Sequence, residues 1–171
     1  QQWLDRLRLD GSGLLLPIAH GLSAVGGSAA LIPLALAVVL WLLWKRRHGE
    51  ALWLFATVAS GRLMVEAIKL VVAKARPALD DRLADVASYS FPSSHSAGSM
   101  LTTVAIAMIV ARQRAMLTPA ILFACAVGWS RMALGVHWPS DVLAGLGFGM
   151  LWAGIAARWL FKARLPSSEI L

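Results

Sequence analysis

The sequence has little cysteine and little charge, and both shortages are informative. Cys125 is the single cysteine in 171 residues, so the chain cannot form an internal disulfide. Only 15% of the residues are charged, and 9 acidic residues stand against 16 basic ones. A soluble domain of this size needs a far more polar surface. The scarcity of charge therefore excludes an ordinary soluble fold.

Apolar residues make up 58% of the chain, and the mean hydropathy is +0.69. A helix needs about 20 mainly apolar residues to cross a membrane. The chain is long enough for five such helices and little else. We therefore predict a single membrane-embedded domain over 1–171, an all-α polytopic helix bundle of five to six spans.

The predicted spans are separated by short polar or glycine-containing segments. Residues 14–27 are apolar but interrupted by Pro17 and by Gly26-Gly27, which favours a short re-entrant or interfacial helix, or the early part of the first span. A polar loop is expected over 73–92. The spans themselves are predicted at 28–44, 51–72, 95–111, 117–134 and 140–161.

The net charge of +7 comes from short basic clusters between apolar runs. This pattern is typical of a membrane protein and argues against nucleic-acid binding. If five spans alternate, these clusters fall on one side, which the preference of Lys and Arg for cytoplasmic loops places inside. The 73–92 loop and the 131–139 turn then face the exterior, and an outer N-terminus hints at a further helix upstream. The clusters are Lys45/Arg46/Arg47, Arg112/Arg114 and Lys162/Arg164.

Two cations lie near the end of the second span. If the helix continues to Pro77, Lys69 and Arg76 share one face, about 10 Å apart along the axis. Lys74 would point elsewhere, toward lipid headgroups. Cations in a span are costly, so this face needs an anionic partner or must reach out to headgroups. Arg62 and Glu66 continue the helical spacing, and we interpret Glu66 as a structural counter-charge.

Two further segments precede later spans. Pro92-Ser93-Ser94-His95 is an ordinary helix opening, but the free N–H groups of a helix N-terminus also bind anions. His137 and Asp141 flank Pro139, so the carboxylate could hold one imidazole nitrogen and leave the other free to attack. Arg131 adds a planar fork suited to phosphate oxygens. Each segment has a structural explanation alone; together they predict a phosphate site.

The three segments resemble the pattern KxxxxxxRP, PSGH and SRxxxxxHxxxD of the type 2 phosphatidic acid phosphatase family, in order and with matching spacing. Ser94 stands where the family usually has glycine. The resemblance implies that His137 attacks phosphorus, that Asp141 orients it and that His95 protonates the leaving oxygen. It also implies phosphate binding by Lys69, Arg76, Ser93, Ser94 and Arg131.

The resemblance implies a lipid phosphatase that needs no cofactor and no metal. The acidic run Asp80-Asp81 to Asp85 is interpreted as a solvated loop. The expected substrate is a lipid phosphate or diphosphate in the bilayer, with undecaprenyl diphosphate preferred over phosphatidylglycerophosphate, phosphatidate or lipid A. The expected location is a bacterial inner membrane, with the site facing the periplasm or exterior. The alternatives are transfer of phosphate to another lipid and a non-enzymatic lipid-phosphate binder or transporter.

Gly145 and Gly149 repeat at the spacing at which small residues allow helices to approach closely. We expect them to pack within the bundle rather than to mediate dimerisation.

Overall fold

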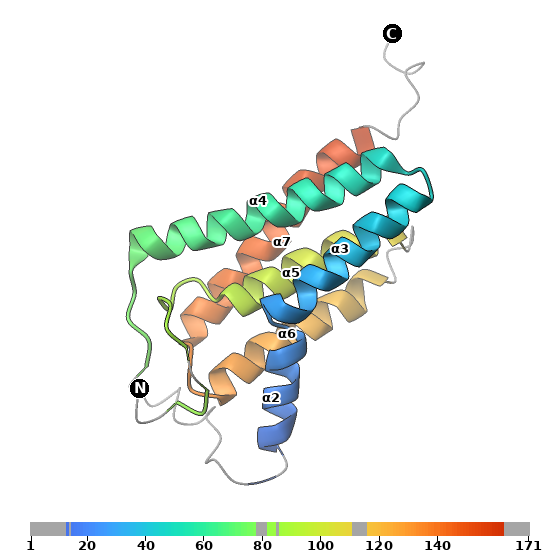
Figure 1. Cartoon of the computed structure of the whole chain (residues 1–171). Helices are drawn as coiled ribbons and strands as arrows, with labels where there is room; N and C mark the ends of the chain where they lie inside the picture. The colour runs from blue at the N-terminus through green and yellow to red at the C-terminus, as the bar shows by residue number, and fades with distance from the viewer. Residues whose placement is uncertain (1–12, 14, 78–81, 85, 111–115, 163–171) are drawn as a thin grey trace.

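The computed structural model describes residues 13, 15–77, 82–84, 86–110 and 116–162. Within these ranges the chain forms six α-helices (Figure 1). The all-α prediction is thus confirmed, and the helices agree with the predicted runs to within a few residues. They are α2 (Leu15–Val25), α3 (Ser28–Trp44), α4 (His48–Val72), α5 (Ser94–Val110), α6 (Leu117–Ala133) and α7 (Pro139–Lys162).

Helix α5 is the centre of the bundle. It packs against α3, α4, α6 and α7, and most of its side chains are buried. Small and hydroxylic residues dominate its first two turns, with Ala97, Gly98 and Ser99 all buried. The neighbouring helices can therefore approach α5 closely around its N-terminus, which is the end that carries His95.

Helices α2 and α3 meet at a bend of 44°. The bend falls at Gly26-Gly27, where the sequence predicts an interruption. A Cβ atom on Gly26 would lie 2.4 Å from both γ carbons of Val127 in α6, and one on Gly27 would lie 3.2 Å from Nε2 of His95. Glycine is thus needed at the bend because two other elements approach the backbone there.

Two helices, α4 and α7, are long and apolar enough to cross a membrane, and the bent α2–α3 pair would make a third span. Helices α5 and α6 are apolar but have 17 residues each, slightly short of a full crossing. The described residues therefore contain two or three clear membrane spans. The count of five to six stays a prediction.

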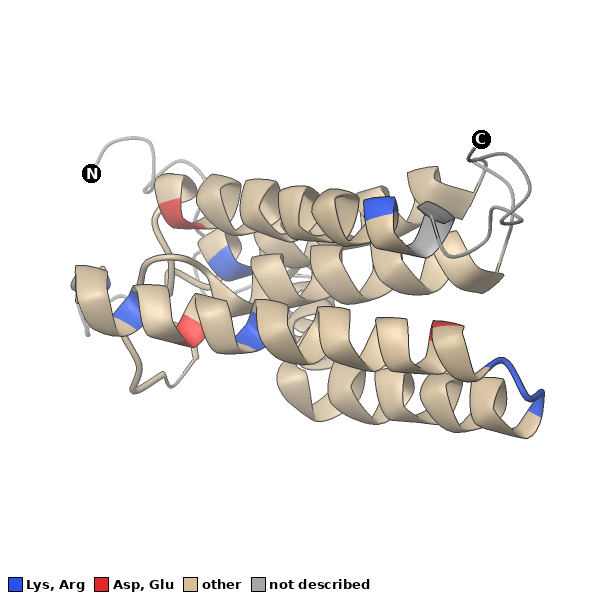
Figure 2. Cartoon of the chain, turned by 90° about the horizontal axis from the view of Figure 1, so that it is seen from above, with Lys and Arg blue, Asp and Glu red and all other residues tan. Residues whose placement is uncertain are grey.

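Charged residues gather at the two ends of the bundle and are sparse between them, except on α4 (Figure 2). The turn between α3 and α4 carries Lys45, Arg46 and Arg47 at one end. The segment after α4 and the turn before α7 lie at the opposite end (Figure 1). Arg112, Arg114 and Arg164 of the predicted basic clusters lie outside the described residues.

The prediction that Gly145 and Gly149 pack within the bundle is confirmed. A Cβ on Gly145 would lie 2.7 Å from the carbonyl oxygen of Ser93, and one on Gly149 would lie 2.6 Å from that of Ala97. Both glycines therefore let the backbones of α5 and α7 touch, which fixes the N-terminus of α5 beside that of α7.

This contact predicts a difference between two glycines of α7. Gly149→Ala should lower the free energy of unfolding by about 1–3 kcal/mol, because the backbone of α5 cannot yield to the added methyl group. Gly147→Ala should be neutral or stabilise by up to about 1 kcal/mol, since no atom lies within 4 Å of its Cβ position and alanine favours a helix. Thermal unfolding in detergent compares them. Equal stability of the two variants would contradict the packing.

Candidate active site

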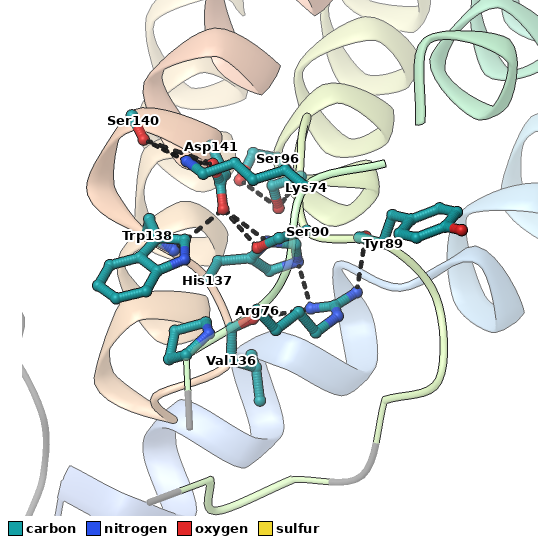
Figure 3. Close-up of polar contacts among 12 residues, drawn as sticks. Lys74, Arg76, Tyr89, Ser90, Ser96, Val136, His137, Trp138, Ser140 and Asp141 are labelled. Carbon is teal, nitrogen blue, oxygen red and sulfur yellow. Dashed lines mark hydrogen bonds and ion pairs between the residues drawn. The ribbon is translucent and has the colours of Figure 1, made fainter. Parts of the chain in front are cut away.

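His137 lies in the short turn between α6 and α7 and is 1% exposed. Its Nε2 atom is 3.0 Å from Nη1 of Arg76 (Figure 3). A guanidinium group can only donate hydrogen bonds, so Nε2 must accept this one. The neutral ring then carries its proton on Nδ1, and the lone pair on Nε2 points toward the positive charge of Arg76.

Asp141 lies on the other side of the same ring, in the first turn of α7. Its Oδ2 atom is 3.7 Å from Nδ1 of His137. The hydroxyl of Ser90 donates to Oδ2 and lies 3.4 Å from Nδ1, and the backbone N–H of Trp138 donates to Oδ2 at 3.2 Å. Asp141 and Ser90 thus face the protonated nitrogen of His137, as an orienting pair would.

The expectation that Lys74 contacts lipid headgroups is wrong. Its ammonium group lies 2.6 Å from Oδ1 of Asp141 and 3.0 Å from the hydroxyl of Ser140 (Figure 3). Asp141 is fully buried, whereas the Lys74 side chain is 35% exposed. Lys74 therefore neutralises the carboxylate that faces His137. Asp141 is shielded from solvent, and Lys74 lies between it and the solvent.

Helix α4 ends where the span was predicted to end, so the helical face proposed for Lys69 and Arg76 does not exist. The helix ends at Val72, and Ala73 adopts a left-handed conformation with φ 46° and ψ 34°, its N–H capping the carbonyl of Lys69. Arg76 therefore lies in a loop and shares no helical face with Lys69. The chain turns after Val72 and carries Lys74 toward α7, which explains the error about that residue.

Lys69 and Arg76 nevertheless converge, because both bind the segment before α5. The ammonium group of Lys69 donates to the carbonyl of Tyr89 at 2.6 Å, and Nη2 of Arg76 donates to the same oxygen at 3.3 Å. Arg76 also donates to the carbonyls of Ser88 at 2.6 Å and Val136 at 2.7 Å. The backbone of this segment thus holds both cations beside His137.

Arg131 supplies the third cation, from the last turn of α6. Its side chain donates to the hydroxyl of Ser23 in α2, and the residue is 3% exposed. Its Nε atom is buried and has no hydrogen-bond partner in the described part of the chain. Arg131, Arg76 and Lys69 are all close enough to act electrostatically on His137. We call Lys69, Arg76 and Arg131 the cation cluster.

The N-terminus of α5 closes the site. The Ser93 backbone N–H donates to the carbonyl of Asp141 at 3.0 Å, which ties α5 to α7. The Ser94 hydroxyl donates to Glu66 at 2.8 Å, so its side chain turns toward α4. His95 lies close enough to His137, Arg76 and Arg131 for electrostatic interaction. All three predicted segments therefore meet at one end of the bundle.

Burial lowers the pKa of His137 to about 4; the hydrogen bond with Asp141 opposes this effect, while Arg76, Arg131 and Lys69 add to it. The imidazole is therefore neutral at neutral pH, which a nucleophile requires. Burial, with Arg82 as a further cause, lowers the pKa of Arg76 to about 10. Arg76 thus still carries its charge at neutral pH.

No group of three or more His, Cys, Asp or Glu side chains in the described ranges is arranged to hold a metal ion. The acidic run that includes Asp80, Asp81 and Asp85 lies outside the described residues.

Residues 50–165 match the model of the PAP2 superfamily. The chain belongs to this superfamily. The crystal structure of a transmembrane PAP2-type phosphatidylglycerolphosphate phosphatase from Bacillus subtilis superposes with a TM-score of 0.86 at 25% identity, covering 94% of this chain and 84% of that one. The bundle is thus the fold of a membrane PAP2 phosphatase.

Curated relatives are phosphatases that differ in substrate. Phosphatidylglycerophosphatase B of Bacillus subtilis is 29% identical over 78% of this chain and 70% of its own length. Decaprenylphosphoryl-5-phosphoribose phosphatase of Mycolicibacterium smegmatis is 36% identical over 74% of this chain and 69% of its own length. Undecaprenyl-diphosphatase of Sulfolobus acidocaldarius is 30% identical over 72% of this chain, which spans 60% of that relative. The family is therefore one of membrane lipid phosphatases, with no single substrate.

The contact between Lys74 and Asp141 predicts a shift in the pH dependence of phosphatase activity. Lys74→Met leaves Asp141 less neutralised, which raises the pKa of His137. The predicted nucleophile His137 can attack only as a neutral imidazole. The acidic limb of the pH–rate profile should therefore move to higher pH, by about one unit for each 1.4 kcal/mol of lost interaction.

Lys45→Met at the opposite end of the bundle is the matched control and should leave the limb in place. A Lys74→Met enzyme that loses activity equally at every pH would contradict the claim that Lys74 acts on His137 through Asp141.

Proposed function

We propose that this membrane phosphatase hydrolyses the terminal phosphate of a lipid phosphate or diphosphate through a phosphohistidine at His137. The observation that supports this most is the orientation of one ring. Nε2 of His137 faces Arg76 and the cation cluster, while Nδ1 faces Asp141 and Ser90. A tetrahedral phosphate bound to the cluster would lie in front of Nε2, whose lone pair faces Arg76.

In the first step, Nε2 of His137 attacks phosphorus. The new N–P bond forms as the bond from phosphorus to the lipid oxygen breaks. His95, which takes up a proton as the anionic substrate binds beside it, gives that proton to the lipid oxygen. Lys69, Arg76 and Arg131 stabilise the charge on the equatorial oxygens, which is the main catalytic task in phosphoryl transfer. The backbone N–H groups at the start of α5, after Ser93, would add hydrogen bonds to the same oxygens.

In the second step, water attacks the phosphohistidine. His95 now takes a proton from the water, the N–P bond breaks, and inorganic phosphate leaves. Asp141 holds the ring through both steps and favours the transient positive charge on it. The charge stabilisation comes from side chains of the chain itself, so the scheme uses no metal.

The lipid we favour is undecaprenyl diphosphate, and the relative named undecaprenyl-diphosphatase supports this choice. The relative named phosphatidylglycerophosphatase B supports the main competing substrate. Transfer of the phosphoryl group to a second lipid would use the same first step. A lipid-phosphate binder without turnover would need the cations but not the His137–Asp141 arrangement.

We further propose that the site faces the exterior of a bacterial inner membrane. The basic turn with Lys45, Arg46 and Arg47 lies at the end of the bundle opposite His137. Lys and Arg are enriched in cytoplasmic loops, which would place that turn inside and the cation cluster outside.

A phosphate-release panel in detergent tests the proposal. Purified protein should release phosphate from undecaprenyl diphosphate, phosphatidylglycerophosphate, phosphatidate or lipid A, and should continue to do so in EDTA. His137→Ala should reduce turnover by at least about 10³-fold while lipid-phosphate binding persists, because the cations remain. The exposed His48→Ala at the opposite end is the control and should be fully active. Unchanged turnover in His137→Ala would rule out the phosphohistidine.

A further inference from the structure

Arg62 lies on α4 seven residues before Lys69, about 10 Å deeper in the bundle. Its Nη1 atom donates to the hydroxyl of Ser28 in α3 at 2.8 Å. On its other side the guanidinium lies against Gly98 of α5, where a Cβ atom would be 3.0 Å from Nη2. The absence of a side chain at Gly98 thus makes room for this arginine between three helices.

Two donor atoms of Arg62 are unused. Nε and Nη2 are buried, and neither has a hydrogen-bond partner within the described residues. Glu66 acts on Arg62 electrostatically from one turn away, in keeping with a counter-charge, but its Oε1 atom accepts the hydroxyl of Ser94. Buried guanidinium N–H groups without acceptors are costly. An anion bound beside Arg62 would satisfy them.

Arg62 also lines a cavity whose wall includes Ser94, the residue before His95. The cavity has a volume of about 190 Å³, and Ser28, Glu66 and Ser94 contribute polar groups to its wall. Ser94 directly precedes His95, and Arg62 is close enough to His95 to act on it electrostatically. The cavity therefore lies beside the start of α5, the helix end that carries His95.

A second cavity of about 200 Å³ has Ile32 and Arg62 in its wall, as the first does. Its remaining wall is apolar, formed by residues of α3 and α4: Ala35, Leu36, Val39, Phe55, Val58 and Ala59. Three environments thus follow one another: the cation cluster at His137, the single cation Arg62 beyond His95, and an apolar space. A terminal phosphate, a second phosphate and a lipid chain have the same order.

We propose that Arg62 binds a second phosphate of the substrate, on the leaving-group side of the bond that is broken. This inference rests on the proposed function, which places the terminal phosphate at the cation cluster. The second phosphate is either the lipid-linked phosphate of a prenyl diphosphate or the phosphodiester of phosphatidylglycerophosphate. A lipid with one phosphate has no group for Arg62, so this residue selects for substrates with two.

Binding to an inactive background tests this without turnover. Dissociation constants of farnesyl diphosphate, farnesyl monophosphate and a short-chain phosphatidylglycerophosphate are measured by calorimetry on full-length His137→Ala and on His137→Ala with Arg62→Met. Arg62→Met should raise the dissociation constant of farnesyl diphosphate, of phosphatidylglycerophosphate or of both by about tenfold or more. The dissociation constant of farnesyl monophosphate should change by no more than about twofold. The doubly phosphorylated ligand that weakens identifies the source of the second phosphate.

Two variants accompany this measurement. Arg62→Lys keeps the positive charge but lacks the planar guanidinium group, so it should cause an intermediate loss of affinity for the same ligand. It serves as the test if Arg62→Met does not fold. Arg158→Met, an exposed arginine of α7, should change nothing. The inference would be overturned if binding of all three ligands weakened equally, or if binding of none of them weakened. If no ligand binds His137→Ala at all, the proposed function itself fails.

Discussion

The site depends on placing three cations around one neutral histidine in an apolar bundle. Insertion of one such cation near the bilayer centre costs about 2.5–3.5 kcal/mol, less near an interface. The chain offsets this cost mainly with neutral oxygens: the Tyr89 carbonyl accepts from both Lys69 and Arg76, and the Ser23 hydroxyl accepts from Arg131. Because no carboxylate forms an ion pair with the cluster in the described ranges, its positive charge remains available to a substrate.

The fold delivers this arrangement through close helix contacts at one end of the bundle. Gly145 and Gly149 bring α7 against α5, and Gly27 brings the α2–α3 bend to within contact of His95. The N-terminus of α5, the turn before α7 and the last turn of α6 therefore converge. The buried carboxylate of Asp141 has its own counter-ion, Lys74. It therefore does not neutralise the cations that face Nε2 of His137.

The helices and the converging segments could be predicted because apolar runs, proline and glycine mark them directly in the sequence. The left-handed turn at Ala73 could not, since alanine is a good helix former and this conformation comes from the fold around it. The contact of Lys74 with Asp141 could not be predicted either, because it depends on that turn. The role of Ser90 could not be predicted, because nothing in a lone serine before Phe91-Pro92 indicates a hydrogen bond to Asp141; only the tertiary structure shows it. Sequence spacing thus identifies the groups proposed to bind the substrate better than the groups that position them.

Mass spectrometry of enzyme quenched in base during turnover of a lipid diphosphate tests the central claim most directly, because phosphohistidine survives alkali. The account predicts a phosphoryl group on the peptide that contains His137, at one ring nitrogen, and none in the His137→Ala protein. A phosphoryl group on His95 or any other residue, or steady turnover with no phosphoenzyme at any time point, would contradict it.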